Sequence, residues 1–364
     1  MKRILLTLMP MHFINDLYSN ILPPLLPLLI ASLNLSHFEA GFIITTSNLL
    51  SAILNPLMGH LSEVRFERKL IMILGFLTLG ISVSLLSLAE EFWQLILITL
   101  LMSFGLSTYH PQALSALSEA YKTSKGKIFG FHGASGALGF SLAPLIIVPL
   151  HNLFGWRSTL IYAFVPSLII SLILWKFVTI KQEKILEEIS MRSLKKSLIL
   201  LLISAFLTSF SFRGLIVFIP TYYVSLGESL LLANLFLFLS LIPNLIGSPI
   251  GGYLSDILGR RLIIALSVLL QGSFMLLFSI FSNPFILFLV GLTNAFSFPV
   301  FLVYSTELSK LKGTTIGYMF GIIMGASSLS PAITGLIIDG FGFTFAFLFL
   351  SLLPFLSLIP LIKT

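Results

Sequence analysis

The chain consists of apolar stretches of about 20 residues that recur along its whole length with few charges inside them. A helix needs about 20 apolar residues to cross a hydrocarbon core of roughly 30 Å. Hydrophobic residues make up 57% of the 364 residues and charged residues only 10%, against about 25% charged in a typical soluble domain. The alternating pattern of a transmembrane β-barrel is absent. The sequence therefore predicts an all-α membrane protein, because a helix satisfies its backbone polar groups within one segment.

Counting the apolar blocks between charges and turn residues predicts twelve transmembrane helices. The longest polar interval divides them into six and six. We therefore expect an N-terminal six-helix bundle at 1–180, a cytoplasmic linker at 181–196 and a C-terminal six-helix bundle at 197–364. The expected spans are 4–32, 38–61, 69–88, 93–117, 127–150, 157–179, 197–224, 230–254, 262–281, 284–307, 314–338 and 342–362.

The basic residues predict the orientation of these spans. With a cytoplasmic N-terminus, all but two of the 21 Lys and Arg residues fall on the inner side, the exceptions being Arg157 and Arg213. This is the positive-inside distribution of a multi-pass protein. It predicts that both termini are cytoplasmic and that the protein lies in the inner, or cytoplasmic, cell membrane. The net charge of +7 follows from this bias, so it implies no nucleic-acid partner. There is no cysteine, which excludes disulfides and thiolate sites.

The two halves of the chain resemble each other. The segment from Pro56 to Glu63 matches the segment from Pro249 to Asp256, and each closes the second span of its half. Gly133-Ala134-Ser135 and Gly325-Ala326-Ser327 match at nearly the same offset. Two six-helix bundles related by a pseudo-two-fold axis are typical of transporters that work by alternating access, with the binding site between the halves.

His12 and Asp16 form an ionisable pair inside the first span. Residues four apart lie on one face of a helix. Asp16 is about 12 residues into the span, or roughly 18 Å at 1.5 Å per residue, which is near the membrane centre. An ionisable residue at that depth is costly and usually functional. We expect Asp16 and His12 to bind and release protons. The alternative for Asp16 is a static ion pair that joins the first span to Arg213 of the seventh.

Other polar residues within spans allow two interpretations each. Arg213 cannot lose its charge, so it either contacts an anionic cargo or pairs permanently with Asp16. His110 precedes Pro111, which removes a backbone hydrogen bond. It is equally expected to contact cargo or to cap a kink.

The segment from Gly252 to Arg261 resembles the loop between spans two and three of the major facilitator superfamily. A turn at Gly259 would place Asp256 near Arg260 and Arg261, where such contacts can close the cytoplasmic side as a gate. The first-half copy departs from the pattern, with Glu63 for the usual Asp and Phe66 for the usual Gly. The alternative is that the basic residues only anchor the loop at the membrane surface.

Five further motifs resemble the fosmidomycin resistance branch of that superfamily. They are His12–Tyr18 with Leu22-Pro23, Tyr109–Ala113, Phe131–Gly133 with Gly136–Phe140, Arg213 with Phe218–Pro220, and Asn294–Val300. The resemblance implies a proton-driven exporter of small organic molecules. The polar residues expected to line its substrate cavity are Asn15, Tyr109, His110, Gln112, Arg213 and Asn294.

Small residues in the fifth span resemble the glycine-and-proline motif of antiporters. They are expected to permit close helix packing and local bending, with counterparts in the eleventh span. The alternative is small-residue packing with no connection to antiport. These residues are Gly133, Gly136, Gly139, Pro144, Gly325 and Pro331.

These observations predict a secondary active transporter rather than an enzyme. It would be a proton-coupled antiporter that exports a small organic compound, anionic or drug-like, and so contributes to drug resistance by efflux. The alternatives are a proton symporter that takes up an organic anion and, from another class, an intramembrane lipid-modifying enzyme with His12 and Asp16 as acid and base. No cofactor and no metal are expected, because the proton gradient supplies the energy. The expected partners are the cargo, protons and the lipid bilayer, and the expected state is a monomer.

Overall fold

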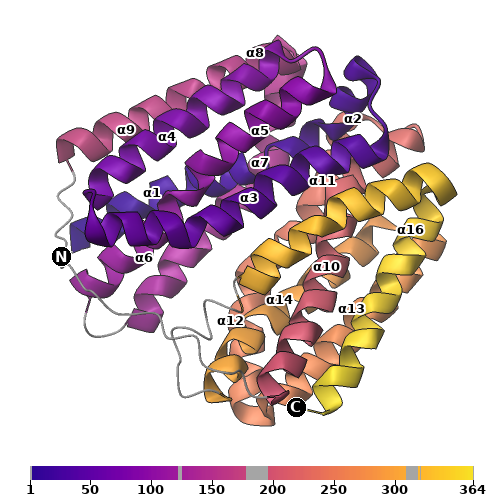
Figure 1. Ribbon diagram of the computed structural model, residues 1–364. Helices are drawn as coiled ribbons and strands as arrows, with labels where there is room; N and C mark the ends of the chain where they lie inside the picture. Colours follow the sequence, from indigo (N-terminus) through magenta and orange to yellow (C-terminus); the bar gives the residue numbers. More distant parts are fainter. Residues whose placement is uncertain (1, 122–124, 178–195, 309–318, 320, 364) are drawn as a thin grey trace. The chain divides into compact units, whose positions relative to one another are not determined.

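A computed structural model describes residues 2–121, 125–177, 196–308, 319 and 321–363, and these residues are helical with short turns (Figure 1). Within them, 11 helical runs are long and apolar enough to cross a membrane. The last run, Gly321–Ile362, has 42 residues, and its helix is interrupted at Gly342 (φ 81°, ψ 169°). The sequence places the boundary between the eleventh and twelfth spans at this point. Of the expected linker at 181–196, residues 181–195 lie outside the described residues, and Lys196 begins a helix.

The chain forms two compact units, and the first contains residues 1–33 and 46–188. Most of its spans consist of two consecutive helices rather than one continuous helix. Its helices are α1 (Lys2–Ser19), α2 (Leu22–Leu33), the larger part of α3 (His37–Val64), α4 (Arg68–Leu85), η1 (Leu86–Leu88), α5 (Phe92–Ser107), α6 (Tyr109–Ala120), α7 (Lys125–Phe154), α8 (Trp156–Tyr162) and α9 (Phe164–Phe177).

The second unit contains residues 34–45 and 189–364, so the opening turns of α3 belong to it. Its other helices are α10 (Lys196–Ser225), α11 (Leu230–Leu241), α12 (Asn244–Leu258), α13 (Arg260–Phe281), α14 (Pro284–Glu307), η2 (Gly321–Gly325), η3 (Ala326–Leu329) and α16 (Ser330–Ile362). The segment η2 is a π-helix and η3 is a 3₁₀-helix.

Breaks within spans follow from local sequence. The first span is interrupted between α1 and α2, where Asn20 donates from its side chain to the Phe140 carbonyl (2.9 Å), and Pro23 and Pro24 follow without backbone N–H groups. The fourth span changes from α5 to α6 at Thr108, three residues before Pro111. Both breaks lie beside the polar motifs of their spans.

The same packing recurs inside each unit. In the first unit, the first span packs along the fifth, as α1 against α7, and α4 packs against α5 and α9 (Figure 1). In the second unit, the seventh span packs along the last helical run, as α10 against α16, and α13 packs against α14 and α16. This recurrence agrees with the repeat in the sequence, and it places the polar residues of α1 against those of α7.

Candidate functional site

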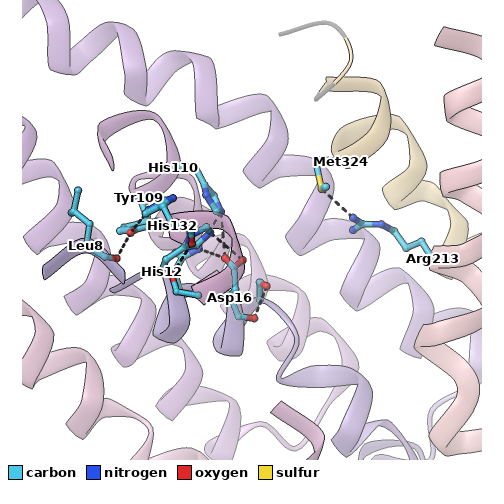
Figure 2. Close-up of polar contacts among 11 residues, drawn as sticks. Leu8, His12, Asp16, Tyr109, His110, His132, Arg213 and Met324 are labelled. Carbon is cyan, nitrogen blue, oxygen red and sulfur yellow. Dashed lines mark hydrogen bonds and ion pairs between the residues drawn. The ribbon is translucent and has the colours of Figure 1, made fainter. Parts of the chain in front are cut away.

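A cluster of polar side chains lies between α1, α6 and α7 of the first unit (Figure 2). Glycines in α7 allow α1 to approach closely. A Cβ at Gly136 would lie 2.5 Å from Asp16 Oδ2, and one at Gly139 would clash with the Phe13 carbonyl. The absence of these side chains creates the space that the cluster fills. Its members are His12, Asn15, Asp16, Tyr109, His110 and His132.

The contact between His12 and Asp16 requires a shared proton. His12 Nδ1 lies 2.8 Å from the backbone carbonyl oxygen of His132, which can only accept, so Nδ1 carries a hydrogen. His12 Nε2 lies 3.2 Å from Asp16 Oδ2. A bare nitrogen lone pair would repel a carboxylate oxygen at that distance. One proton therefore lies between the two atoms, either on the imidazole as an ion pair or on the carboxyl group as a neutral hydrogen bond.

The other carboxylate oxygen of Asp16 contacts His110. Asn15 Nδ2 donates to Asp16 Oδ1 (3.0 Å) and lies 3.3 Å from His110 Nε2, while His110 Nε2 lies 3.5 Å from Asp16 Oδ1. Protonated, His110 Nε2 donates to the carboxylate; unprotonated, it accepts from Asn15. The arrangement therefore provides a hydrogen-bond partner for His110 Nε2 with or without a hydrogen on it.

Tyr109 fixes the state of the third histidine. Its hydroxyl donates to the Leu8 carbonyl (2.6 Å), which uses its single hydrogen. Towards His132 Nε2, 2.9 Å away, the hydroxyl oxygen can only accept, so His132 Nε2 carries a hydrogen. The His132 ring is stacked on His12 with centroids 4.1 Å apart. His132 thus supports the His12 ring from its face and, through its carbonyl, from its edge.

Exposure decreases along the cluster. The side chain of His110 is 39% exposed, that of Asp16 is 19% and that of His12 is 9%. Of these three side chains, His110 is therefore the most exposed and His12 the most buried. The arrangement joins an exposed imidazole to the buried pair of His12 and Asp16 through short polar contacts. His12, Asp16 and His110 each have one possible ligand atom, and these three atoms lie within 4.8 Å of one another, a spacing that a metal ion could use. The shared proton accounts for the close contacts without a metal ion.

Several residues expected to line a substrate cavity make contacts within the first unit, and their role towards a cargo stays a prediction. Gln112 is fully buried and donates to the Met58 carbonyl (3.1 Å), so it joins α6 to α3. Tyr109 and Asn15 are 1% exposed and orient the histidines and the carboxylate. Of the four expected cavity residues in the first unit, His110 has the most exposed side chain. Asn294 is half-buried on α14 of the second unit.

Arg213 lies on α10 in the second unit, and its Nη2 contacts the sulfur of Met324 at 3.5 Å (Figure 2). Asp16 belongs to the first unit, so the expected pair between the two residues stays a prediction.

The end of the first unit where α4 begins has an ion pair that the sequence motif does not indicate. Glu63, the expected gate residue, lies outside the residues whose side chains are described. Arg68, which is 2% exposed and begins α4, instead contacts Glu119 at the end of α6, with Nη1 2.7 Å from Oε1. This contact ties the start of the third span to the end of the fourth.

The second unit has a comparable contact at the expected gate. Arg260 pairs with Asp256 and with Glu307, whose Oε1 lies 3.1 Å from Nε, and it also donates to Ser255 Oγ (2.6 Å). Glu307 ends α14, so the fourth span of this half is again tied to the start of the third. Arg261 has a different role, because it donates to the Ile362 carbonyl near the C-terminal end of α16.

The small residues of the fifth and eleventh spans do not all pack in the expected way. A Cβ at Gly133 would have no atom within 4 Å, so the close approach of α1 depends on Gly136 and Gly139. The helix α7 continues through Pro144. In the second unit, Gly325 ends the π-helix η2, and the Pro331 carbonyl leaves no room for a side chain at Gly41.

Asp339 is a further polar residue that the sequence motifs miss. Its carboxylate on α16 accepts from the backbone N–H groups of His37 (3.0 Å) and Phe38 (2.8 Å) and lies 2.7 Å from His37 Nδ1. It therefore caps the N-terminus of α3 within the second unit. An isolated aspartate near a predicted loop carries no local signal for such a role.

Comparison with known proteins agrees with this fold. The chain is 25% identical to the uncharacterized transporter YfnC of Bacillus subtilis, over 96% of this chain and 89% of that protein. It is 24% identical to the fosmidomycin resistance protein of Escherichia coli, over 96% and 90% of the two chains. The crystal structure of a nucleoside transporter, NupG, matches its fold with a TM-score of 0.86 at 14% identity, covering 99% of each chain.

A family model described as the Major Facilitator Superfamily matches residues 8–328 and 201–363. The match covers nearly the whole chain, including both units and the polar cluster of α1, α6 and α7. The chain is therefore a multi-pass membrane transporter rather than an enzyme, and it belongs to the Major Facilitator Superfamily.

Proposed function

We propose that this transporter exports a small organic compound in exchange for protons, by alternating access. The observation that carries the proposal is the contact of His12 Nε2 with Asp16 Oδ2 at 3.2 Å, which requires one shared proton. The contact lies inside the first span, where an uncompensated charge is costly. A change in proton occupancy there alters the charge of the span, so the conformations of the carrier become coupled to proton binding.

The arrangement supports a sequence of steps. A proton enters at His110, which is the solvent-accessible member, and passes to the carboxylate of Asp16. With the shared proton on His12, the incoming proton is a second one; it neutralises the Asp16 carboxylate and weakens its bonds to His12 and Asn15. Release of this second proton on the other side of the membrane restores them. The two bonding patterns available to His110 give its Nε2 a partner before and after the proton passes to Asp16.

Export is the direction that the relatives favour. The chain resembles, over most of its length, a protein named for resistance to fosmidomycin and others named for multidrug resistance. Resistance conferred by a carrier of this superfamily is consistent with efflux of a drug-like compound. The proposed partners are this cargo and protons, with no cofactor, and the proposed working form is a monomer.

The proposal includes a membrane topology of twelve crossings in two six-helix bundles. The positive-inside distribution of Lys and Arg supports cytoplasmic termini and the inner cell membrane. The interruption at Gly342 supports two crossings within the last helical run. Because the natural chain has no cysteine, single cysteines introduced at the N-terminus and near Gly342 can be labelled without background. A membrane-impermeant maleimide added to intact cells should label the second position only.

Flux in proteoliposomes tests the function. Fosmidomycin and a panel of drug-like compounds are supplied outside vesicles with an acidic lumen, and accumulation is measured. Proton exchange predicts accumulation that stops when nigericin collapses the pH gradient. Accumulation driven by the opposite gradient would support symport instead. Movement that ignores the gradient, or lipid turnover with no cargo movement, would overturn the proposal.

A further inference from the structure

Arg213 is a cation within a membrane span, and among the described residues of its own unit it has no acidic partner. It lies about midway along α10. Its described contact is with the thioether of Met324 (3.5 Å), and a thioether is a weak acceptor that carries no charge. A guanidinium keeps its charge at any physiological pH, so burial at this depth requires a negative partner from elsewhere.

The acidic residues of the second unit are all engaged or distant from Arg213. Asp256 and Glu307 pair with Arg260, and Asp339 caps α3. Glu39 accepts from the backbone N–H and hydroxyl of Ser36, and Glu228 is exposed in the turn before α11. These five are the acids of this unit, and among the described residues none lies within 4.0 Å of the guanidinium.

The backbone facing Arg213 is irregular. Met324 belongs to the π-helical segment Gly321–Gly325, which continues into the 3₁₀ segment Ala326–Leu329 before α16 begins. Such backbone is tolerated at membrane depth where it is buried in protein or lines a cavity, and π-turns are frequent at functional sites. A Cβ at Gly321 would meet no atom within 4 Å, so space is open beside this segment.

We propose that Arg213, together with the segment Gly321–Leu329, forms a subsite for an oxyanion carried by the cargo, either a carboxylate or a phosphonate. The guanidinium has five donors in a planar fork, and most of them have no described partner. A carboxylate or phosphonate accepts two of them at once. The polarisable side chain of Met324, which is 37% exposed, lies where it can contact the apolar body of the same molecule.

This inference rests on the proposed transport function, because it assigns the charge of the cargo. The rival explanation is that Arg213 is the permanent partner of Asp16 and never contacts cargo. The two explanations differ in what happens when Asp16 is neutralised. A permanent pair predicts that loss of the carboxylate frees the guanidinium and strengthens the binding of added anions, whereas an anion subsite predicts little change.

Binding to the purified protein in neutral-lipid nanodiscs tests the subsite. The probes are benzoate and phenylphosphonate, with the uncharged benzamide as the matched control, and the variants are Arg213→Gln and Arg213→Lys. We expect both anions to bind at least about tenfold more tightly than benzamide, since charge-assisted hydrogen bonds are roughly twice as strong as neutral ones. Arg213→Gln should abolish this preference, and Arg213→Lys should weaken it because the fork is lost. The exposed Arg65→Gln serves as the control and should keep it.

Three results would overturn the subsite. They are equal binding of benzoate and benzamide, an anion preference that survives in Arg213→Gln, and stronger anion binding in Asp16→Asn. If Arg213→Gln does not fold, the comparison of the wild type with Arg213→Lys and Asp16→Asn still decides. Repeating the titration with inorganic phosphate and in nanodiscs of anionic lipid separates cargo from other sources of the oxyanion. If inorganic phosphate or anionic lipid occupies the subsite as tightly as the probes do, the subsite belongs to free phosphate or to a lipid headgroup and not to cargo.

The inference and the proposed function fail separately. Anion preference that depends on Arg213, combined with flux that ignores the pH gradient, would keep the subsite and reject proton exchange. Proton-driven flux of cargo without any anion preference would keep the exchange and reject the subsite.

Discussion

Tyr109 and His132 share a hydrogen bond whose direction is fixed by a third group. The Tyr109 hydroxyl donates its one hydrogen to the Leu8 carbonyl and lies 2.9 Å from His132 Nε2, so the histidine must be the donor. The His132 ring is therefore held as one tautomer beneath His12. The structure fixes the buried end of the cluster, while His110 keeps two bonding patterns.

Removing the Tyr109 hydroxyl should selectively disturb the buried end of the cluster, where His132 stacks on His12. Tyr109→Phe removes the side-chain donor to the Leu8 carbonyl and leaves His132 Nε2 without its acceptor. We expect proton-driven flux to fall about tenfold while cargo-bound protein remains detectable. The pH dependence of flux should also change, because His132 can then adopt its other tautomer and rotate away from His12. Tyr162→Phe, at a position that is 59% exposed, is the matched control and should leave both flux and its pH profile unchanged.

Neutralising the carboxylate should uncouple transport. Asp16→Asn keeps the shape of the side chain but cannot hold the shared proton with His12 Nε2. We expect gradient-driven flux to drop to the rate measured with the gradient collapsed, while exchange of cargo for cargo continues. Glu90→Gln, an exposed carboxylate of the same half, controls for loss of negative charge. Full gradient-driven flux in Asp16→Asn would remove this residue from the mechanism.

A chelator separates a proton from a metal at the cluster. Because the close contacts are explained by a shared proton, flux after treatment with EDTA and removal of the chelator should equal that of untreated vesicles. Added Zn²⁺ serves as a positive control for access, since imidazole and carboxylate ligands bind it. Loss of flux on chelation, with recovery on adding metal, would contradict the proton assignment.

The pair of Arg68 and Glu119 should contribute to stability as a buried ion pair. Arg68→Ala leaves the Glu119 carboxylate, which is 22% exposed, without its cation, and we expect a loss of about 3 kcal/mol in the free energy of unfolding. The double variant Arg68→Met with Glu119→Leu should recover most of it. Reversible unfolding in mixed micelles measures both, and the exposed Arg65→Ala is the control. Equal losses in the single and double variants would show that packing rather than charge is responsible.

The cap on α3 should control local opening of its first turn. Asp339→Asn keeps one acceptor oxygen but loses the charge that accepts from both His37 and Phe38. We expect the peptide containing these residues to exchange its amide hydrogens about fivefold faster, equivalent to roughly 1 kcal/mol of capping energy. Glu228→Gln should leave the rate unchanged. Hydrogen exchange measured by mass spectrometry reads the peptide directly.

Much of the membrane architecture could be predicted from the sequence, because it follows from the length of the apolar runs and the positions of charges and prolines. Pro111 indicates the break at Thr108, and the turn residues before position 342 indicate the interruption at Gly342. The spacing of His12 and Asp16 was enough to predict their contact, since residues four apart on a helix face the same way.

The partners of that pair could not be predicted. His132 is 1% exposed and stacks on His12, yet the sequence indicates it only as part of the motif Phe131–Gly133. Helices that are apolar on all sides give no periodic signal for which face is buried, so the rotation of α7 against α1 is not readable. The same lack of signal hid the contact of Gln112 with the Met58 carbonyl and the pairing of Arg68 with Glu119.

Gly136 has a consequence for how this protein tolerates mutation. It has no functional group, yet the space of its missing side chain is where His12 and Asp16 meet. In a saturation mutagenesis screen scored by drug survival, position 136 should therefore be as intolerant as position 16, with alanine already deleterious. Position 133, three residues earlier and facing open space, should accept alanine freely.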